Sequence, residues 1–198
     1  GLLAASVLVI HHLRPEWPIL AVIAVLSPIV ALFTLLVRDG MRAFEAFGRL
    51  ITVRLPELGN EIGLFLGAGI LSAGMAGVIA ALDLAVPFTR FGGGEASLVL
   101  VFIVVMSWLG FHPVILVSVI GPWVQTIHPD PNLLAMTFLM TWGMGLPACP
   151  MSGTLVAMSG RYHIPYRAVL DRNRVYAMKL VAAGVVVLNL YAALVVPR

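Results

Sequence analysis

Charged side chains are scarce in this chain of 198 residues, since Asp, Glu, Lys and Arg together make up 11% of it while 61% is hydrophobic. Soluble domains carry about 25% charged residues, so a chain this apolar could not cover its surface with polar groups in water. A single cysteine, Cys149, excludes an intramolecular disulfide and a multi-cysteine metal site. The high apolar content also excludes intrinsic disorder. These absences predict an integral membrane protein whose partner is the lipid bilayer.

Basic residues are in slight excess, with 12 against 9 acidic residues and a net charge of +3. They lie between apolar blocks, where topology signals belong, so we expect no nucleic-acid partner. Sequence patterns of hydrolases are missing as well: there is no GxSxG, no HExxH and no pair of intramembrane aspartates. We therefore expect no enzyme, no catalytic residue and no metal site.

Three uncharged segments are of a length to cross a bilayer, which takes about 20 residues in a helix. They are Ile19–Val37, Ile62–Leu82 and Leu180–Pro197. The apolar run Leu2–Leu13 is short, and Gly1 stands directly before it, so we expect the chain to be a fragment or a trimmed protein. An all-α polytopic membrane protein is the predicted fold class, with a bacterial inner membrane as its expected location.

The segment Met41–Arg54 has a different pattern, because apolar side chains recur there at helical spacing between charged ones. This pattern predicts an amphipathic helix on the membrane surface, with a simple loop as the alternative. The later segment Ile62–Leu82 is rich in glycine, which predicts close packing against another helix. The glycines of this segment are Gly63, Gly67, Gly69, Gly74 and Gly77.

Residues 96–127 contain no charged side chain. As one straight helix they would reach about 48 Å, more than one bilayer core of about 30 Å. Gly110-Phe111-His112-Pro113 near the middle should break the helix, because Pro113 lacks an N–H group and glycine is a weak helix former. Two interpretations follow from the residues: one long broken span, or a re-entrant hairpin that leaves on the side where it entered.

The distribution of positive charge favours the hairpin. Nine of the twelve basic residues lie in two connections, residues 38–57 and 161–179. Basic connections are expected on the cytoplasmic side. Both connections can be cytoplasmic only if residues 96–127 re-enter on one side, and the C-terminus then lies outside.

A second break is predicted within residues 133–160, which are also uncharged. Two prolines and three glycines fall between Gly143 and Thr154, which should prevent a regular helix there. Unwound backbone deep in a membrane is tolerated only inside protein or beside water, and transporters use such helix ends to bind solutes. Freed carbonyls and the hydroxyls of Ser152 and Thr154 are suitable ligands for Na⁺. A proline-kinked helix without a ligand is the alternative.

His112 stands at the first break and could bind an anion or relay a proton. It could equally be held by a freed carbonyl at the tip of the hairpin. An intramembrane enzyme using Cys149 or His112 would need a nucleophile and a base within hydrogen-bonding distance.

The order of span, surface helix, span, hairpin, broken span and final span resembles the C-terminal half of the ion transporter superfamily of secondary carriers. That superfamily includes the divalent anion–sodium symporters and related carboxylate permeases. The stretch Leu146–Pro165 (LPACPMSGTLVAMSGRYHIP) resembles the family's unwound element. Ser107–Pro113 stands where the family's hairpin tip carries Ser-Asn-Thr, and Glu57–Gly69 resembles the family's entry into a glycine-rich helix.

The resemblance implies a secondary carrier of a small organic anion, with Na⁺ or H⁺ as the coupling ion and no other cofactor. It also implies a homodimer or a missing N-terminal half, with residues 1–198 as one membrane domain. Within it, residues 1–57 would be scaffold and 58–198 the transport repeat. The expected binding residues are Ser107, Gly110, His112, Pro113, Pro147, Cys149, Pro150, Ser152, Gly153 and Thr154. A scaffold or assembly subunit without transport activity is the competing hypothesis.

Overall fold

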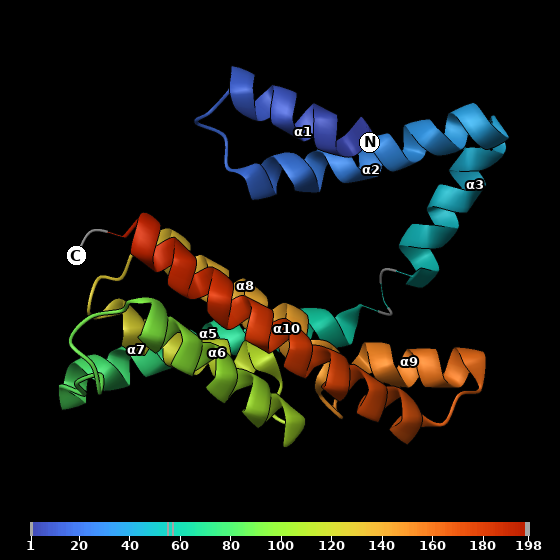
Figure 1. Cartoon of the computed structure of the whole chain (residues 1–198). Coiled ribbons are helices and arrows are strands. Elements are labelled where there is room, and N and C mark those ends of the chain that lie inside the picture. Colours follow the sequence, from blue (N-terminus) through green and yellow to red (C-terminus); the bar gives the residue numbers. More distant parts are fainter. Residues whose placement is uncertain (1, 55, 57, 197–198) are drawn as a thin grey trace. The chain divides into compact units, whose positions relative to one another are not determined.

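The computed structural model describes residues 2–54, 56 and 58–196, and helices make up 81% of it, with no strand among the described residues. The predicted all-α class is confirmed at this level. Figure 1 labels the elements. They are α1 (Leu2–Leu13), α2 (Ile19–Asp39), α3 (Arg42–Arg49), the π-helix η1 (Leu50–Arg54), α5 (Gly59–Leu82), α6 (Gly93–Trp108), α7 (Pro113–Gln125), α8 (Pro131–Ala148), α9 (Gly153–Tyr162) and α10 (Tyr166–Leu194).

Among the described residues, four helical segments are long and apolar enough to cross a membrane, which indicates an integral membrane protein. They are Ile19–Asp39, Glu61–Leu82, Pro131–Val156 and Tyr166–Leu194. Large apolar side chains on these helices are exposed, such as Leu20 and Leu194, each 81% accessible. Lipid is the solvent in which such surfaces are stable.

The chain forms two compact units, residues 1–63 and 64–198. In the first unit, α1 packs on α2 and α2 on α3. Of the segment Met41–Arg54, residues 42–54 are helical as predicted, in α3 and η1, rather than a simple loop. Helix α2 continues through Pro28 and is followed by Gly40, whose φ of +59° is a conformation that suits glycine. Glu57 and Pro197, which the sequence analysis used, lie outside the described residues.

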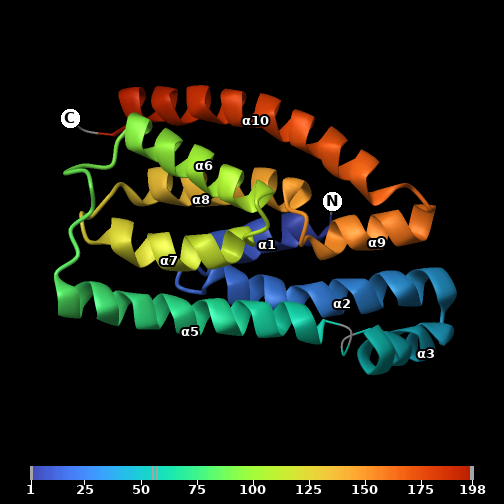
Figure 2. The same cartoon turned by 90° about the horizontal axis from the view of Figure 1, so that it is seen from below.

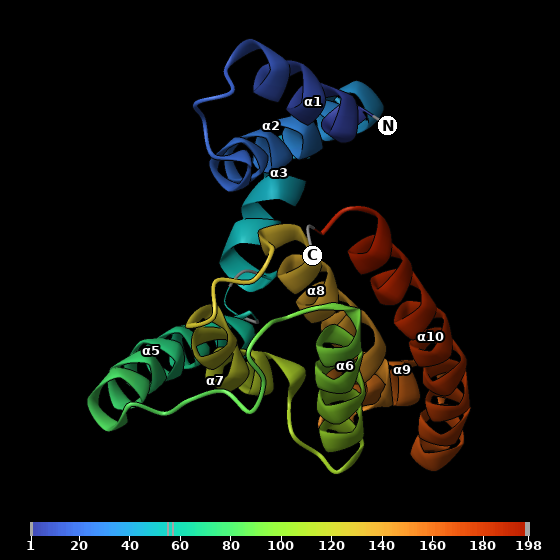
Figure 3. The same cartoon turned by 60° about the vertical axis from the view of Figure 1, so that its left-hand side comes forward.

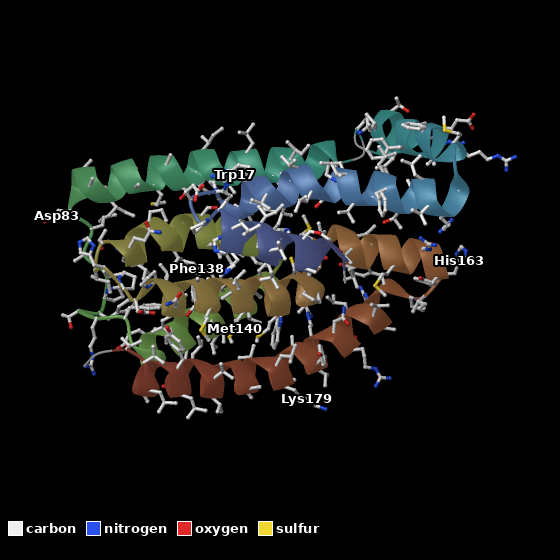
Figure 4. All side chains as sticks on the ribbon, turned by 90° about the horizontal axis from the view of Figure 1, so that it is seen from above. Trp17, Asp83, Phe138, Met140, His163 and Lys179 are labelled. Carbon is white, nitrogen blue, oxygen red and sulfur yellow. The ribbon has the colours of Figure 1, made fainter. Side chains whose placement is uncertain are left out.

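The core of the second unit lies where α6, α8 and α10 pack together, side by side in Figures 2 and 3. Leu100 and Ile103 of α6, Leu133 of α8 and Leu188 of α10 are fully buried there. In Figure 4, Met140 lies on α8 and Lys179 projects outward from α10. The Met140 sulfur packs close to Gly184 of α10, where an added Cβ would lie 3.5 Å from it.

Helices α6 and α7 form an antiparallel pair within this unit. In Figure 2, α6 runs from the end of the unit where the C-terminus lies to its middle, and α7 runs back toward the same end. Helix α8 also starts at that end, and α9 continues from the middle to the opposite end. Figure 4 marks the two ends with Asp83 and His163. The breaks after α6 and after α8 therefore both lie in the middle of the unit.

The structure corrects two boundaries. The predicted unwound centre, residues 143–154, is shorter than expected, because α8 stays helical to Ala148 and only Cys149–Ser152 is non-helical. Pro147 is tolerated because it stands in the last turn of α8, where its missing N–H leaves a single carbonyl without its helical partner. The predicted connection 161–179 is helical from Tyr166 onward, so its basic residues Arg167 to Lys179 stand on α10. Residues 38–57 likewise include α3 and η1.

Asp130 stabilises the start of α8. Its carboxylate Oδ1 accepts a hydrogen bond from the backbone N–H of Leu133 at 2.8 Å and lies 3.4 Å from the Tyr191 hydroxyl. We expect Asp130→Ala to lower the free energy of unfolding by about 1 kcal/mol, because an N-terminal N–H of the helix loses its acceptor. Asp130→Asn should lower the free energy of unfolding by only a fraction of this amount. SDS-induced unfolding in mixed micelles measures both, and equal losses would contradict the capping role.

Candidate functional site

The two helix breaks of the second unit touch each other. The link between α6 and α7 is residues 109–112, and the link between α8 and α9 is residues 149–152. A Cβ built on Gly110 would lie 3.9 Å from Cγ of Pro150 and from Cγ of Met151. The Cys149 sulfur lies 3.7 Å from the Phe111 carbonyl oxygen. Residues predicted at two separate breaks are thus brought into one place.

The first link is a tight turn built on Gly110. The Gly110 φ of +109° suits glycine, and its N–H donates to the Ser107 carbonyl at 3.1 Å. Ser107 is fully buried, and its hydroxyl donates to the Ile103 carbonyl at 2.8 Å. The hydroxyl of this predicted binding residue is therefore already used as a donor within its own helix.

His112 begins α7 as its N-cap. Its Nδ1 accepts a hydrogen bond from the backbone N–H of Val114 at 3.3 Å, and Pro113 follows as the first helical residue. The imidazole thus binds a backbone N–H rather than the freed carbonyl expected in one of our interpretations. An Nδ1 that accepts a hydrogen bond carries no proton. This bond therefore forms only with the neutral imidazole ring and is lost when Nδ1 is protonated.

The second link places Ser152 in an unusual position. Ser152 is the N-cap of α9 and is fully buried, yet its hydroxyl makes no hydrogen bond within the described structure. Pro147, Gly153 and Thr154 are exposed. The structure therefore puts the Cys149, Pro150 and Ser152 positions inside the contact between the links, and the other three at its edge.

Helix α10 contributes three side chains that the sequence analysis did not select. The Tyr166 hydroxyl donates to the Pro150 carbonyl, and Asn173 Nδ2 donates to the Pro147 carbonyl at 3.0 Å. Arg174 Nη2 donates to the Trp108 carbonyl at 2.7 Å. Positions 166, 173 and 174 share one helix face, since they stand seven and eight residues apart. That spacing is the sequence signal that could identify these three residues as one polar helix face. The charge pattern alone predicts only a basic connection at residues 161–179.

Close packing positions the two links. A Cβ on Gly145 of α8 would lie 2.9 Å from Ser107 Oγ and 3.1 Å from Pro113 Cγ. Only a glycine lets α8 approach the end of α6 and the start of α7 this closely.

Three buried polar atoms around the links make no hydrogen bond within the described part of the chain. They are Ser152 Oγ, Trp108 Nε1 and Arg174 Nε. Most buried polar atoms in proteins are paired, so each of these three points to a partner that the described chain does not supply.

No cluster of three or more His, Cys, Asp or Glu side chains suited to a metal occurs among the described residues. Cys149 and His112 each bind backbone atoms, the Phe111 carbonyl and the Val114 N–H, rather than each other. The polar groups of the site are hydroxyl, amide, indole and guanidinium groups.

No family model matches the chain, and neither a curated protein nor a solved structure matches it.

Proposed function

We propose that this chain is the C-terminal half of a secondary carrier that moves a small organic anion across the membrane, driven by Na⁺ or H⁺. The observation that carries the proposal is the contact between the two helix breaks, Gly110 against Pro150 and Met151 and the Cys149 sulfur against the Phe111 carbonyl. In the proposal, α6 and α7 are a re-entrant hairpin, and α8 and α9 are the two halves of a broken span.

Helix ends supply the electrostatics of the proposed site. The N-termini of α7 and α9, at His112 and Ser152, both start at the links. Helix N-termini carry partial positive charge and favour an anion. The C-termini of α6 and α8 end at the same links and carry partial negative charge, which favours the coupling cation. Solute and ion would therefore bind side by side.

The basic residues fit this topology. Arg161 and Arg167 stand at the end of the unit that holds the turn between α9 and α10, marked by His163 in Figure 4. Placing this end in the cytoplasm satisfies the positive-inside rule and puts the open end of the α6–α7 pair outside. The other half of the carrier, or a second copy, would complete the site.

A scaffold or assembly subunit is the second candidate, and one observation favours it. The links are in direct contact, with Gly110 against Pro150 and Met151 and with Gly145 against Ser107. In a subunit without transport activity this contact would only fix the packing of α6 and α8.

Uptake into vesicles separates the two candidates. We expect the reconstituted chain to take up radiolabelled short-chain carboxylates, and Ser152→Ala to weaken uptake about fivefold, the loss of one neutral hydrogen bond to the solute. Ser118→Ala is the matched control, because that serine is also buried but its hydroxyl donates to Val114 of its own helix at 2.7 Å. Equal uptake by both variants would exclude the proposed role of Ser152. No uptake by the unmodified chain, alone or with its other half, would favour the scaffold.

A further inference from the structure

The guanidinium group of Arg174 is half-buried, and its Nε–H has no hydrogen-bond partner within the described structure. Nη2 donates to the Trp108 carbonyl. Nε and Nη2 form the edge with which arginine binds both oxygens of a carboxylate. The ion pairs among the described residues are Arg14–Glu16 and Arg38–Asp39, both in the first unit. Arg174 thus lacks a counter-charge.

The unpaired polar atoms of Trp108 and Ser152 can also donate hydrogen bonds to an acceptor. The indole N–H of Trp108, like the guanidinium N–H, can donate a hydrogen bond but cannot accept one. The Ser152 hydroxyl can do both. Asn173 and Tyr166, on the same face of α10 as Arg174, bind the carbonyls on either side of Cys149. A set made mostly of donors, with one fixed positive charge, requires an anionic acceptor.

A cavity beside this cluster indicates the rest of the ligand. It is an open groove of about 200 Å³ between α6 and α10, lined by Val101, Val104, Val105, Trp108, Met178 and Val181, of which Val101, Val105 and Met178 are exposed. Trp108 is therefore common to the cavity and to the Arg174 contact. Met178 stands one turn beyond Arg174 on α10, so the two residues share one face of that helix. Its walls are aliphatic, apart from the indole.

We propose that Arg174 binds the carboxylate of a monocarboxylate whose short hydrocarbon chain occupies this cavity, with the Trp108 indole and the Ser152 hydroxyl as further donors. This inference rests on the proposed carrier function and names its solute class. A second carboxylate on the solute would have to enter the apolar cavity and lose its hydration without a partner, which opposes dicarboxylates.

Butyrate and succinate test the inference, because they have the same number of carbon atoms and differ in the second carboxylate. The measurement is the thermal stabilisation of the full chain in lipid nanodiscs as a function of ligand concentration. We expect butyrate to bind at least about tenfold more tightly than succinate, and Arg174→Ala to weaken butyrate binding about 10- to 100-fold. Arg174→Lys should recover part of the loss, since an ammonium group keeps the charge but not the two-point geometry. Arg172→Ala, on the exposed part of the same helix, should leave butyrate binding unchanged.

Several outcomes would overturn the inference: no stabilisation of the unmodified chain by butyrate at millimolar concentration, succinate binding as tightly as butyrate, or unchanged butyrate affinity in Arg174→Ala. Should Arg174→Ala fail to fold, Trp108→Phe removes only the indole N–H from the same site, and its butyrate affinity should still fall severalfold. Butyrate binding without uptake into vesicles would reject the carrier and keep the binding site. Uptake with an unchanged KM in the Arg174 variants would keep the carrier and reject the site.

Discussion

Replacing Gly145 by valine will force α8 away from the α6–α7 link and, in the proposed carrier, stop uptake. The new Cβ would lie 2.9 Å from Ser107 Oγ, closer than real Cβ contacts allow, and 3.1 Å from Pro113 Cγ, which is tighter than most such contacts. Both neighbours are fully buried, so they have little room to shift. Overpacking of this kind costs up to about 3 kcal/mol in free energy of unfolding. We expect the variant to unfold at a lower SDS fraction, and to show none of the uptake proposed for the unmodified chain.

Gly143→Val is the control for this substitution. Gly143 stands in the same helix, two residues earlier, and a Cβ built there meets nothing within 4 Å. The two variants have the same change in helix propensity, so their difference isolates the contact with Ser107 and Pro113. Equal stability and uptake in both variants would show that α8 does not pack against the link as described.

Replacing Gly93 by valine will separate α6 from α10. A Cβ on Gly93 would lie 2.8 Å from the Asn189 Cα and 2.7 Å from its Oδ1. The first of these is backbone, which cannot rotate away, and Asn189 is held by hydrogen bonds from its Nδ2 to Ser97 Oγ at 2.9 Å and to the Val185 carbonyl at 2.8 Å. We expect a loss of about 3 kcal/mol in free energy of unfolding.

Gly94→Val provides the comparison, because an added Cβ at Gly94 meets nothing within 4 Å. SDS-induced unfolding should leave Gly94→Val close to the unmodified chain. Unfolding of the Gly93 variant at the same SDS fraction as the Gly94 variant would disprove the close crossing of α6 and α10.

The glycines that matter for packing are not those that the sequence emphasised. The series from Gly63 to Gly77 on α5 predicted a close helix contact, yet a Cβ built on any of them meets nothing within 4 Å in the described structure. Gly93, Gly145 and Gly184, which are not part of such a series, make the close contacts. A run of small residues permits helices to approach, but the facing helix decides whether they do.

The sequence alone determined the membrane class and the approximate positions of both helix breaks. Both follow from local chemistry: long uncharged runs require lipid, and Pro113 and Pro150 lack the N–H that a continuous helix needs. The same reasoning overestimated the second break, because a proline in the last turn of α8 disturbs only one carbonyl.

Only the tertiary structure brought Gly110 against Pro150 and placed Arg174 on the Trp108 carbonyl. Those partners are 40 or more residues apart in the chain. Their meeting depends on how α6, α8 and α10 pack, and hydropathy and charge along the sequence carry no information about which faces of three similarly apolar helices touch. In the sequence, a basic side chain near an apolar run therefore cannot be told apart from one that only sets the orientation in the membrane. The packing shows which carbonyl it binds.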